Sequence, residues 1–500
     1  MKAGRIFILG LSWVVVMGWG MVAVAQAPDT LWTRTYGGPG EDKAYCIRET
    51  TDGGFIIAGS TSSYGAGGLD CWLVKINNNG DTLWTRTYGG PDNDEAFSVA
   101  QTADGGYVFV GYSRLSSSTY EKIYVVRVNS TGDTVWTRFY QYIFYPTGVD
   151  EFRDNRGYSV TLSNDGGIVF TGFSKWLSTD WPGYPPENFG QMVLQKLGSN
   201  GGTQWLRSYG LTFGQFDQNS GYSIRSTTGG GYIVAGKYDN VSRVLMWLLK
   251  ANNQGNLVWN QFYGPEGGVG YDVQSTEDGG YIIAGQNTYL SGGGSYCLVK
   301  TDSNGNEEWH RGYNIINNAC SVEVLPDRGY IITGSGIGWP SLPLVRTNSN
   351  GDTLWTKRFG QIGHIAEGRS LILTSDGGYL VAGYTTGAMG YDFYVIKLEP
   401  ELQVPIQQHS PLPEQYILHN AYPNPFNSTT TISYEVPVRG RVRVNIYNIL
   451  GQEVATVADG VVSPGSYSVV WDAGELPSGI YFVKMEAGEF VQTRKVVLLK

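Results

Sequence analysis

The chain repeats one pattern of apolar and polar positions seven times. The most regular part is D-G-G-[YF] followed by aliphatic residues and a glycine, as at residues 52–59 and 376–383. An aromatic-Ser-aliphatic segment precedes it in three copies, at residues 97–99, 158–160 and 222–224, and a G-[DN]-x-x-W segment follows it. The D-G-G triplet predicts a tight hairpin turn, because glycine accepts positive φ. The segments of alternating polarity around it predict short strands.

The spacing of the repeat is regular enough to count its copies. The turn element begins at Asp52, Asp104, Asp165, Gly229, Asp278, Asp327 and Asp376. The tryptophans of the second element are Trp32, Trp84, Trp136, Trp205, Trp259, Trp309 and Trp355. They are separated by 52, 52, 69, 54, 50 and 46 residues. Each repeat predicts four short strands, which we label A to D in chain order. Four short strands per repeat are typical of one blade of a β-propeller.

We therefore predict an all-β fold with a seven-bladed β-propeller over residues 26–400. A solenoid of stacked sheets is the alternative. The last repeat lacks its D strand, whereas an unaccompanied D strand lies near the N-terminus at residues 31–36. We expect this strand to pair with residues 391–398 and complete the last blade, which removes an exposed sheet edge. A solenoid would not explain the missing and the extra strand.

Composition narrows the class of protein. With 70 Gly, 41% hydrophobic and 16% charged residues, the chain can bury a core, and neither disorder nor collagen fits. The net charge is −9 and no cluster of Lys and Arg stands out, so we expect no nucleic-acid partner. The four cysteines, Cys46, Cys71, Cys297 and Cys320, show no obvious disulfide pairing, although export would permit one.

The N-terminus predicts a secretory signal peptide over residues 1–25. Lys2 and Arg5 precede an apolar run that ends in small residues, and we place the cleavage between Ala25 and Gln26. Cleavage after Ala27 would put a proline just past the cut, and an uncleaved anchor is the other alternative. No later segment reaches the roughly 18 apolar residues of a membrane span, so none is expected in the mature chain.

A second domain begins after a change in composition. Residues 401–413 contain three prolines and no strand pattern, which is typical of a linker. Strands are predicted at residues 431–436, 441–447, 453–457, 467–471, 480–486 and 491–498. Six or seven strands in so short a segment predict a small Ig-like β-sandwich over residues 414–500.

The motifs of this second domain occur in a fixed order up to the last residue. They are Y-P-N-P-F-N, I-Y-N-I-L-G-Q-E-V, G-S-Y-S-V-V-W-D, L-P-S-G-I-Y-F and a closing K-V-V-L-L-K. Together they resemble the C-terminal sorting domain of type IX secretion cargo, Por secretion family, type A. The matching positions include Tyr422, Pro423, Asn424, Pro425, Phe426, Asn427, Gly451, Trp471, Gly479 and Tyr481.

This resemblance implies an export route. Bacteroidetes-type bacteria carry such cargo into the periplasm and then across the outer membrane, steered by the sorting domain and the type IX machinery. It implies secretion or attachment at the cell surface. An ordinary Ig-like binding module is the alternative. The G-[DN]-x-x-W turns also resemble the tryptophan-docking repeats of quinoprotein-type propellers, and less closely the Asp-box of sialidases. Both support a propeller, and the tryptophans are interpreted as packing between blades.

The propeller offers one candidate ligand surface. Variable loops between strands D and A and between B and C share one face, and in the third repeat they carry Phe144, Tyr145, Trp176, Trp181 and Tyr184. Such rings suit sugar faces or protein contacts. The prolines of this loop favour the alternative of a local mini-core. Acidic D–A loops could hold Ca²⁺, but no D-x-D-x-D-G loop occurs, and we predict no metal or cofactor.

Catalytic motifs do not stand out. G-x-S-x-G, H-E-x-x-H and Walker loops are missing from the sequence. A serine recurs in strand A at Ser98, Ser159, Ser223, Ser321 and Ser370, where close packing of the innermost strands explains it better than nucleophilic catalysis. We therefore expect a surface protein that binds or scaffolds, and not an enzyme. The alternative is a secreted hydrolase or lyase acting on polysaccharide, with its site on the variable-loop face.

Overall fold

The computed structural model contains two compact units, Met1–Leu402 and Gln403–Lys500. It describes the chain from residue 27 onward, except for residues 116–119, 143–148, 179–186, 211–218, 241–242, 265–266, 288–294, 337–340, 388, 402–414, 439, 463–464 and 475. The predicted signal peptide, with Ala25 and Gln26, therefore lies outside the described residues, as does almost all of the predicted linker. Within the described part, no helix is long and apolar enough to cross a membrane.

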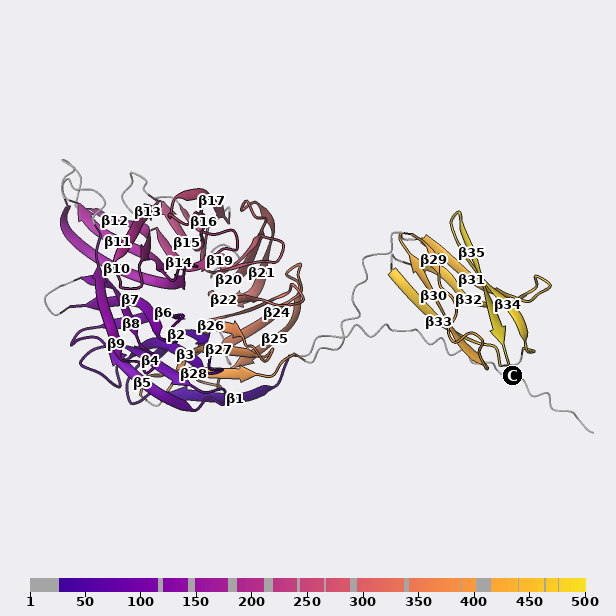
Figure 1. Cartoon of the computed structure of the whole chain (residues 1–500), viewed down its shortest axis with the longest axis horizontal. Helices are drawn as coiled ribbons and strands as arrows, with labels where there is room; N and C mark the ends of the chain where they lie inside the picture. The colour runs from indigo at the N-terminus through magenta and orange to yellow at the C-terminus, as the bar shows by residue number, and fades with distance from the viewer. Residues whose placement is uncertain are drawn as a thin grey trace, which may run out of the picture. The chain divides into compact units, whose positions relative to one another are not determined.

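The first unit consists of seven four-stranded antiparallel sheets (Figure 1). Blade 1 contains β2 (Asp42–Glu49), β3 (Phe55–Thr61), β4 (Asp70–Ile76) and β5 (Thr82–Tyr88). Blade 2 contains β6 (Asp94–Gln101), β7 (Tyr107–Arg114), β8 (Glu121–Val128) and β9 (Thr134–Tyr140). Blade 3 contains β10 (Val149–Leu162), β11 (Ile168–Ser178), β12 (Glu187–Leu197) and β13 (Thr203–Tyr209).

The remaining blades follow the same strand order. Blade 4 contains β14 (Ser220–Ser226), β15 (Tyr232–Asn240), β16 (Arg243–Ala251) and β17 (Leu257–Tyr263). Blade 5 contains β18 (Gly268–Ser275), β19 (Tyr281–Asn287), β20 (Ser295–Thr301) and β21 (Glu307–Ile316). Blade 6 contains β22 (Ala319–Val324), β23 (Tyr330–Gly334), β24 (Leu342–Thr347) and β25 (Thr353–Phe359). Blade 7 contains β26 (Ala366–Leu373), β27 (Tyr379–Thr386), β28 (Tyr391–Leu398) and β1 (Thr30–Tyr36).

Closure occurs as the sequence predicts. The N-terminal strand β1 pairs antiparallel with β28, with Thr33 opposite Ile396 and Tyr36 opposite Phe393. The heptapeptide T-L-W-T-R-T-Y of β1 is identical to that of β5, the fourth strand of blade 1. The same sequence thus forms an outer strand at the seam and within the ring, and the predicted seven-bladed propeller is confirmed.

Each D-G-G turn is held by a buried cation of its own blade. In blade 1 the carboxylate of Asp52 accepts hydrogen bonds from the N–H of Gly54 at 3.0 Å and from the ammonium of Lys75 at 3.0 Å. Lys75 lies on β4 and is almost fully buried, so this ion pair ties the turn to the third strand. Five further blades repeat it with Asp104–Arg127, Asp165–Lys196, Asp278–Lys300, Asp327–Arg346 and Asp376–Lys397.

The outer strands join one blade to the next. The indole of Trp32 donates to the carbonyl of Asn78 at 3.2 Å, and the hydroxyl of Tyr36 donates to the carbonyl of Gly80 at 2.6 Å. Gly80 has a φ of 80° and lies against the Trp32 ring, so only glycine fits this turn. Equivalent tyrosine-to-carbonyl bonds are Tyr88–Gly132, Tyr140–Gly201, Tyr209–Gly255, Tyr263–Gly305 and Tyr313–Gly351. The tryptophan repeat is therefore an inter-blade clasp, as the sequence predicts.

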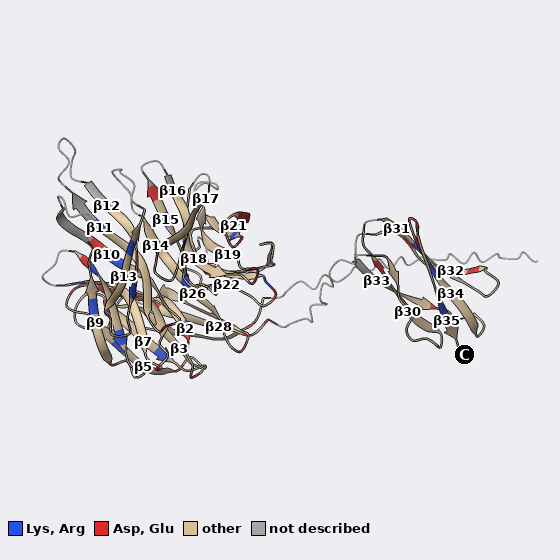
Figure 2. Cartoon of the chain, turned by 45° about the horizontal axis from the view of Figure 1, so that its top comes forward, with Lys and Arg blue, Asp and Glu red and all other residues tan. Residues whose placement is uncertain are grey.

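The clasp also shows how the chain leaves the ring. In blade 7 the chain leaves the propeller after β28 and does not turn back into a fourth strand. The outer strand of blade 6, β25, therefore has no such turn in blade 7 to contact. Glu401 takes its place and accepts hydrogen bonds from the Trp355 indole and the Arg346 guanidinium, both at 3.0 Å. Figure 2 shows the basic positions of the outer strands β5, β9 and β13 as blue segments. Among them, Arg138 on β9 stacks over the Trp136 ring at 5.5 Å.

The second unit is a β-sandwich of two sheets. One sheet has the order β29-β30-β33, and the other has the order β32-β31-β34-β35. Their strands are β29 (Ile417–Leu418), β30 (Thr429–Val436), β31 (Gly440–Tyr447), β32 (Glu453–Val462), β33 (Gly465–Asp472), β34 (Gly479–Ala487) and β35 (Phe490–Leu498). All six predicted strands occur, and β32 runs five residues further than expected because its hairpin with β31 continues to Val462.

Candidate functional site

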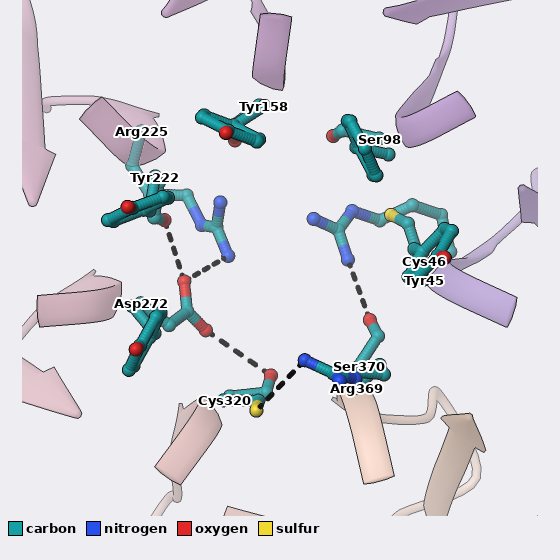
Figure 3. A pocket seen from close by; sticks show the side chains of 16 residues that line it. Tyr45, Cys46, Ser98, Tyr158, Tyr222, Arg225, Asp272, Cys320, Arg369 and Ser370 are labelled. Atoms are coloured by element: carbon teal, nitrogen blue, oxygen red, sulfur yellow. Dashed lines mark hydrogen bonds and ion pairs between the residues drawn. The ribbon is translucent and has the colours of Figure 1, made fainter. Parts of the chain in front are cut away.

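A central channel is lined by the first strand of every blade. Each of these strands contains a bulge at the same place, between Ala44 and Cys46 in blade 1 and between Gly157 and Ser159 in blade 3, for example. The cavity measures about 160 Å³. It is lined by Tyr45, Cys46, Arg48, Phe97, Ser98, Tyr158, Ser159, Tyr222, Ser223, Arg225, Tyr271, Asp272, Cys320, Ser321, Arg369 and Ser370. Figure 3 shows these side chains converging on the lumen.

The bulged residues form an aromatic belt around five-sevenths of the channel. Tyr45, Phe97, Tyr158, Tyr222 and Tyr271 contact one another in sequence, with ring centroids 5.0–5.4 Å apart. Blades 6 and 7 complete the ring with Cys320 and Arg369, whose guanidinium lies 3.8 Å from the thiol. The belt therefore lines the lumen with five aromatic rings, one thiol and one guanidinium group.

The next layer is a ring of serines that joins the blades. The hydroxyl oxygen of Ser98 accepts the N–H of Val160 in the following blade at 3.2 Å. Ser159, Ser321 and Ser370 accept a backbone N–H of the next blade in the same way. These hydroxyls are hydrogen-bonded across the seams of the ring, which is the packing role that the sequence predicts for the serine series.

Two blades depart from this ring: Cys46 replaces the serine in blade 1, and Asp272 replaces it in blade 5. The Asp272 carboxylate accepts hydrogen bonds from the hydroxyl of Ser223 at 2.7 Å, the guanidinium of Arg225 at 2.9 Å and the N–H of Val322 at 3.1 Å. Figure 3 shows Arg225 extending toward the centre of the lumen beside Asp272. The sequence analysis does not single out Asp272. The available signal was that an aspartate follows the tyrosine in the fifth repeat, where the third and fourth repeats have a serine.

A partly buried carboxyl group lies beyond this layer. Burial and the charge of Asp272 raise the pKa of Glu323 to about 7, against the opposing effect of Arg225 and Arg48. Gln274 donates a hydrogen bond to Glu323 at 3.2 Å. Arg48 lies within 3.5 Å of the Ser370 hydroxyl. This part of the channel therefore combines two guanidinium groups with two carboxyl groups.

Replacing Glu323 should change how stability depends on pH. Because the folded-state pKa of about 7 exceeds the ordinary value of 4.5, the wild type should lose stability as pH rises between these values. Glu323→Gln should remove this loss. We expect the variant to be more stable than the wild type at pH 8 by about 1–2 kcal/mol, reduced for its partial exposure, and equally stable near pH 4.5. Urea titrations at both pH values measure this, with the exposed Glu277→Gln as control. A variant without any gain at pH 8 would disprove it.

The channel mouth on the variable-loop side carries a polar network. Glu95 accepts hydrogen bonds from the hydroxyls of Tyr45 at 2.6 Å and Tyr112 at 2.7 Å. Arg156 stacks 4.6 Å above the Tyr112 ring and pairs with Glu121 at 2.8 Å. Tyrosine hydroxyls and charged groups at one opening provide donors and acceptors for a polar ligand.

The predicted ligand-binding aromatics are not placed by the structure. Phe144, Tyr145, Trp181 and Tyr184 lie outside the described residues. The backbone of Trp176 is on β11, opposite Phe189 of β12, and not in the B–C loop where the sequence analysis places it, because the β11–β12 hairpin extends to Ser178 and Glu187. The assignment of a ligand to these five residues therefore stays a prediction.

The sorting motif residues divide into core and surface positions. Phe426, Trp471 and Tyr481 form a buried aromatic cluster, with Trp471 tilted against Phe426 and edge-to-face with Tyr481 at centroid distances of 5.3 and 5.6 Å. Asn424 binds the last strand through the backbone of Lys495 and Val497. The other positions are at the surface or in turns: Tyr422 is 81% exposed, Gly451 has a φ of 76° in the β31–β32 turn, and Gly479 begins β34.

Other reactive side chains are structurally engaged. All four cysteines are free thiols, and three of them are buried. His364 contacts the carbonyl of Thr386 through Nδ1 at 3.0 Å. Among the described residues, no group of three or more His, Cys, Asp or Glu side chains is arranged to hold a metal ion.

Comparison with known proteins identifies the tail. Residues 420–499 match the model of the secretion system C-terminal sorting domain. No curated protein matches the chain. Solved structures similar to it include a protein of unknown function from Bacteroides caccae, with 16% identity, 60% of this chain and 94% of that chain covered, and a TM-score of 0.36.

Two enzymes are also among the similar structures. A fungal alcohol oxidase of the AA5 family, in complex with copper, shares 12% identity over 95% of this chain and 100% of its own, with a TM-score of 0.45. An α-L-arabinanase of Penicillium chrysogenum, complexed with arabinobiose, shares 10% identity over 75% of this chain and 99% of its own, with a TM-score of 0.41. Likenesses at this level carry no argument about activity, and the fold assignment rests on the strand order.

The strand order and the matched tail define the class of protein: a seven-bladed β-propeller with an export domain. Its C-terminal domain is a type IX secretion sorting domain. The chain is therefore exported through the type IX machinery and is secreted or attached to the cell surface.

Proposed function

We propose that the exported propeller is a binding or scaffold module, and not an enzyme. The observation that supports this is the seam of hydrogen bonds around the channel. The serine hydroxyls accept backbone N–H groups of neighbouring blades, and Asp272 accepts from Ser223, Arg225 and Val322. These hydroxyl and carboxylate groups hold neighbouring blades together. They are poorly placed to exchange protons or attack a substrate, because each reaction step would break a hydrogen bond between blades.

The variable-loop face is the surface proposed for the ligand. Its mouth combines the hydroxyls of Tyr45 and Tyr112 with the charged groups of Glu95 and Arg156. Aromatic rings beside hydrogen-bonding groups suit a surface glycan or a protein hot spot. The aromatics predicted in the blade 3 loops would extend this surface.

A glycan array probed with the mature chain, residues 26–500, tests the proposal. We expect specific binding that falls at least about tenfold, or 1.4 kcal/mol, when Trp176 and Trp181 are both replaced by Ala. Val135→Ala is the control, because Val135 is a 59% exposed apolar side chain on the outer strand β9 and not in a variable loop. Equal binding by the double variant would refute the loop assignment.

A secreted hydrolase or lyase acting on polysaccharide is the second candidate. Glu323 favours it, because a carboxyl group with a pKa of about 7 close to the Asp272 carboxylate is the kind of pair that divides acid and base roles. Release of reducing ends from an array hit, abolished by Glu323→Gln, would support this candidate. Binding without product release supports the binding module.

A further inference from the structure

Two pairs of aspartates lie close together where neighbouring blades meet. Asp42 begins β2 in the first blade, and Asp392 lies near the start of β28 in the last. Asp392 Oδ1 and Asp42 Oδ2 lie 2.3 and 2.6 Å from the position that a Cβ on Gly37 would occupy, so these oxygens are at most about 5 Å apart. Asp42 is fully buried. Closure of the ring thus brings together two carboxylates that are remote in sequence.

The next interface repeats the arrangement. Asp94 begins β6 in blade 2, and Asp70 begins β4 in blade 1. Asp94 Oδ2 and Asp70 Oδ1 lie 2.3 and 2.6 Å from the corresponding position on Gly89. Asp94 is 0% and Asp70 is 2% exposed. Each pair therefore joins the first strand of one blade to the third strand of the preceding blade.

In each of the buried carboxylates of Asp42 and Asp94, only one of the two oxygens accepts a hydrogen bond. Asp42 Oδ2 accepts hydrogen bonds from the Gly38 N–H at 2.8 Å and the Ser63 hydroxyl at 2.7 Å, but buried Oδ1 has no hydrogen-bond partner. Asp94 Oδ2 likewise accepts from the Gly90 N–H at 2.7 Å, while buried Oδ1 has none. A buried carboxylate oxygen without a partner is costly, because its charge has lost its water.

The side chains nearby do not neutralise these pairs. Burial, followed by the charge of Asp42, raises the pKa of Asp392. Burial also raises the pKa of Asp94, and the charge of Asp70 adds to this, although the Ser113 hydroxyl and the N–H groups of Gly90 and Arg114 act in the opposite direction. Among the described residues, none of the four aspartates forms an ion pair with a lysine or arginine.

The lysine that follows Asp42 in the sequence is engaged elsewhere. Lys43 pairs with Glu41 at 2.9 Å and lies 4.6 Å above the Tyr391 ring. The following interface provides a contrast within the same protein. There Glu121, the first residue of β8, pairs with Arg156 at 2.8 Å and with Arg114 at 3.6 Å. Arginines thus pair with that single carboxylate, whereas none of the described arginines pairs with either set of aspartates.

We propose that each aspartate pair binds one calcium ion, at the junctions of blades 7 and 1 and of blades 1 and 2. Calcium is the hard cation that fits, because it accepts carboxylates together with carbonyl, hydroxyl and water oxygens in irregular geometry. The Asp42–Asp392 ion would bridge the first and last blades and so reinforce ring closure. These metal sites are separate from the proposed ligand site. They differ from the sequence-based prediction that the protein binds no metal.

Metal content and melting temperature of the mature chain test the proposal. After treatment with EDTA and dialysis against CaCl₂, we expect two bound Ca²⁺ per chain by isothermal titration and elemental analysis. The melting temperature should rise by about 5 °C between EDTA and saturating Ca²⁺. Mg²⁺ should stabilise less, because it requires near-octahedral geometry.

Single substitutions assign the ions. Asp42→Asn and Asp94→Asn should each leave one Ca²⁺ per chain, and the double variant should bind none and melt at the same temperature with EDTA and Ca²⁺. Blades 3 and 4 carry Asn155 and Asn219 at the equivalent position, so asparagine is compatible with this site. If either variant fails to fold, Asp392→Asn and Asp70→Asn test the same sites from the opposite strand.

The controls are carboxylates of the same loops that lie outside the pairs. Glu41→Gln and Asp92→Asn should retain two ions. A wild type that binds no Ca²⁺ at millimolar concentration would overturn the proposal, and so would a double variant that still binds two ions. Stabilisation by acid alone, equal in EDTA and in Ca²⁺, would show that the pairs share a proton and would overturn it as well.

Discussion

Deletion of residues 28–37 is expected to lower the melting temperature of the propeller by roughly 10 °C or more. The deletion removes β1, which supplies the fourth strand of blade 7 and pairs with β28 along its whole length. It also removes the clasp of Trp32 and Tyr36 on the β4–β5 turn of blade 1. The unpaired edge of β28 would then face solvent and become a site for association with other chains. Differential scanning calorimetry and size-exclusion chromatography of the mature chain measure both effects.

A matched pair of point variants tests whether the effect of the deletion comes from the loss of ring closure or only from a shorter chain. Trp32 and Trp84 occupy the same place in two identical heptapeptides, one at the seam and one within the ring. If β1 is a blade strand, Trp32→Ala and Trp84→Ala should destabilise the propeller to a similar extent, by about 2–4 kcal/mol each, since both rings are partly buried between blades. A harmless Trp32→Ala beside a damaging Trp84→Ala would contradict closure by the N-terminal strand.

The repeat made the propeller predictable because its signals are local. A D-G-G turn, a pair of short strands and a G-[DN]-x-x-W turn lie within one blade, so their spacing in the sequence is also their spacing in the fold. Even closure could be predicted, because counting strands exposed one missing and one extra copy. The sandwich strands were located by the same alternation of polarity, with only their ends shifted.

The channel and the aspartate pairs could not be predicted in this way. Which residue of a first strand faces the lumen depends on a bulge, and the alternation of side chains reverses there. The seam that Asp272 forms with Val322 requires two separate blades in register. Asp42 and Asp392 meet only because the ring closes, so their proximity has no signal in either local sequence.

Removal of residues 414–500 is expected to abolish display at the cell surface and leave the propeller in the periplasm. These residues contain the segment that matches the sorting domain family, whereas the predicted signal peptide, which would drive the first transport step, is at the other end of the chain. Protease accessibility on intact cells, compared with the periplasmic fraction, measures the distribution. The truncated chain should still reach the periplasm, which serves as the internal control. Normal surface display of the truncated chain would contradict the role of the tail.

Two point variants then test whether the machinery requires the folded domain. Trp471 is 3% exposed and packs between Phe426 and Tyr481, so Trp471→Ala should cost about 3–5 kcal/mol, a large share of the stability of so small a domain. Val461 is 66% exposed on β32, and Val461→Ala should leave both fold and display unchanged. If Trp471→Ala unfolds the tail and display persists, the signal must be a linear motif. If display is lost together with the fold, the sandwich itself is recognised, because its motifs then act by placing strands and turns in three dimensions.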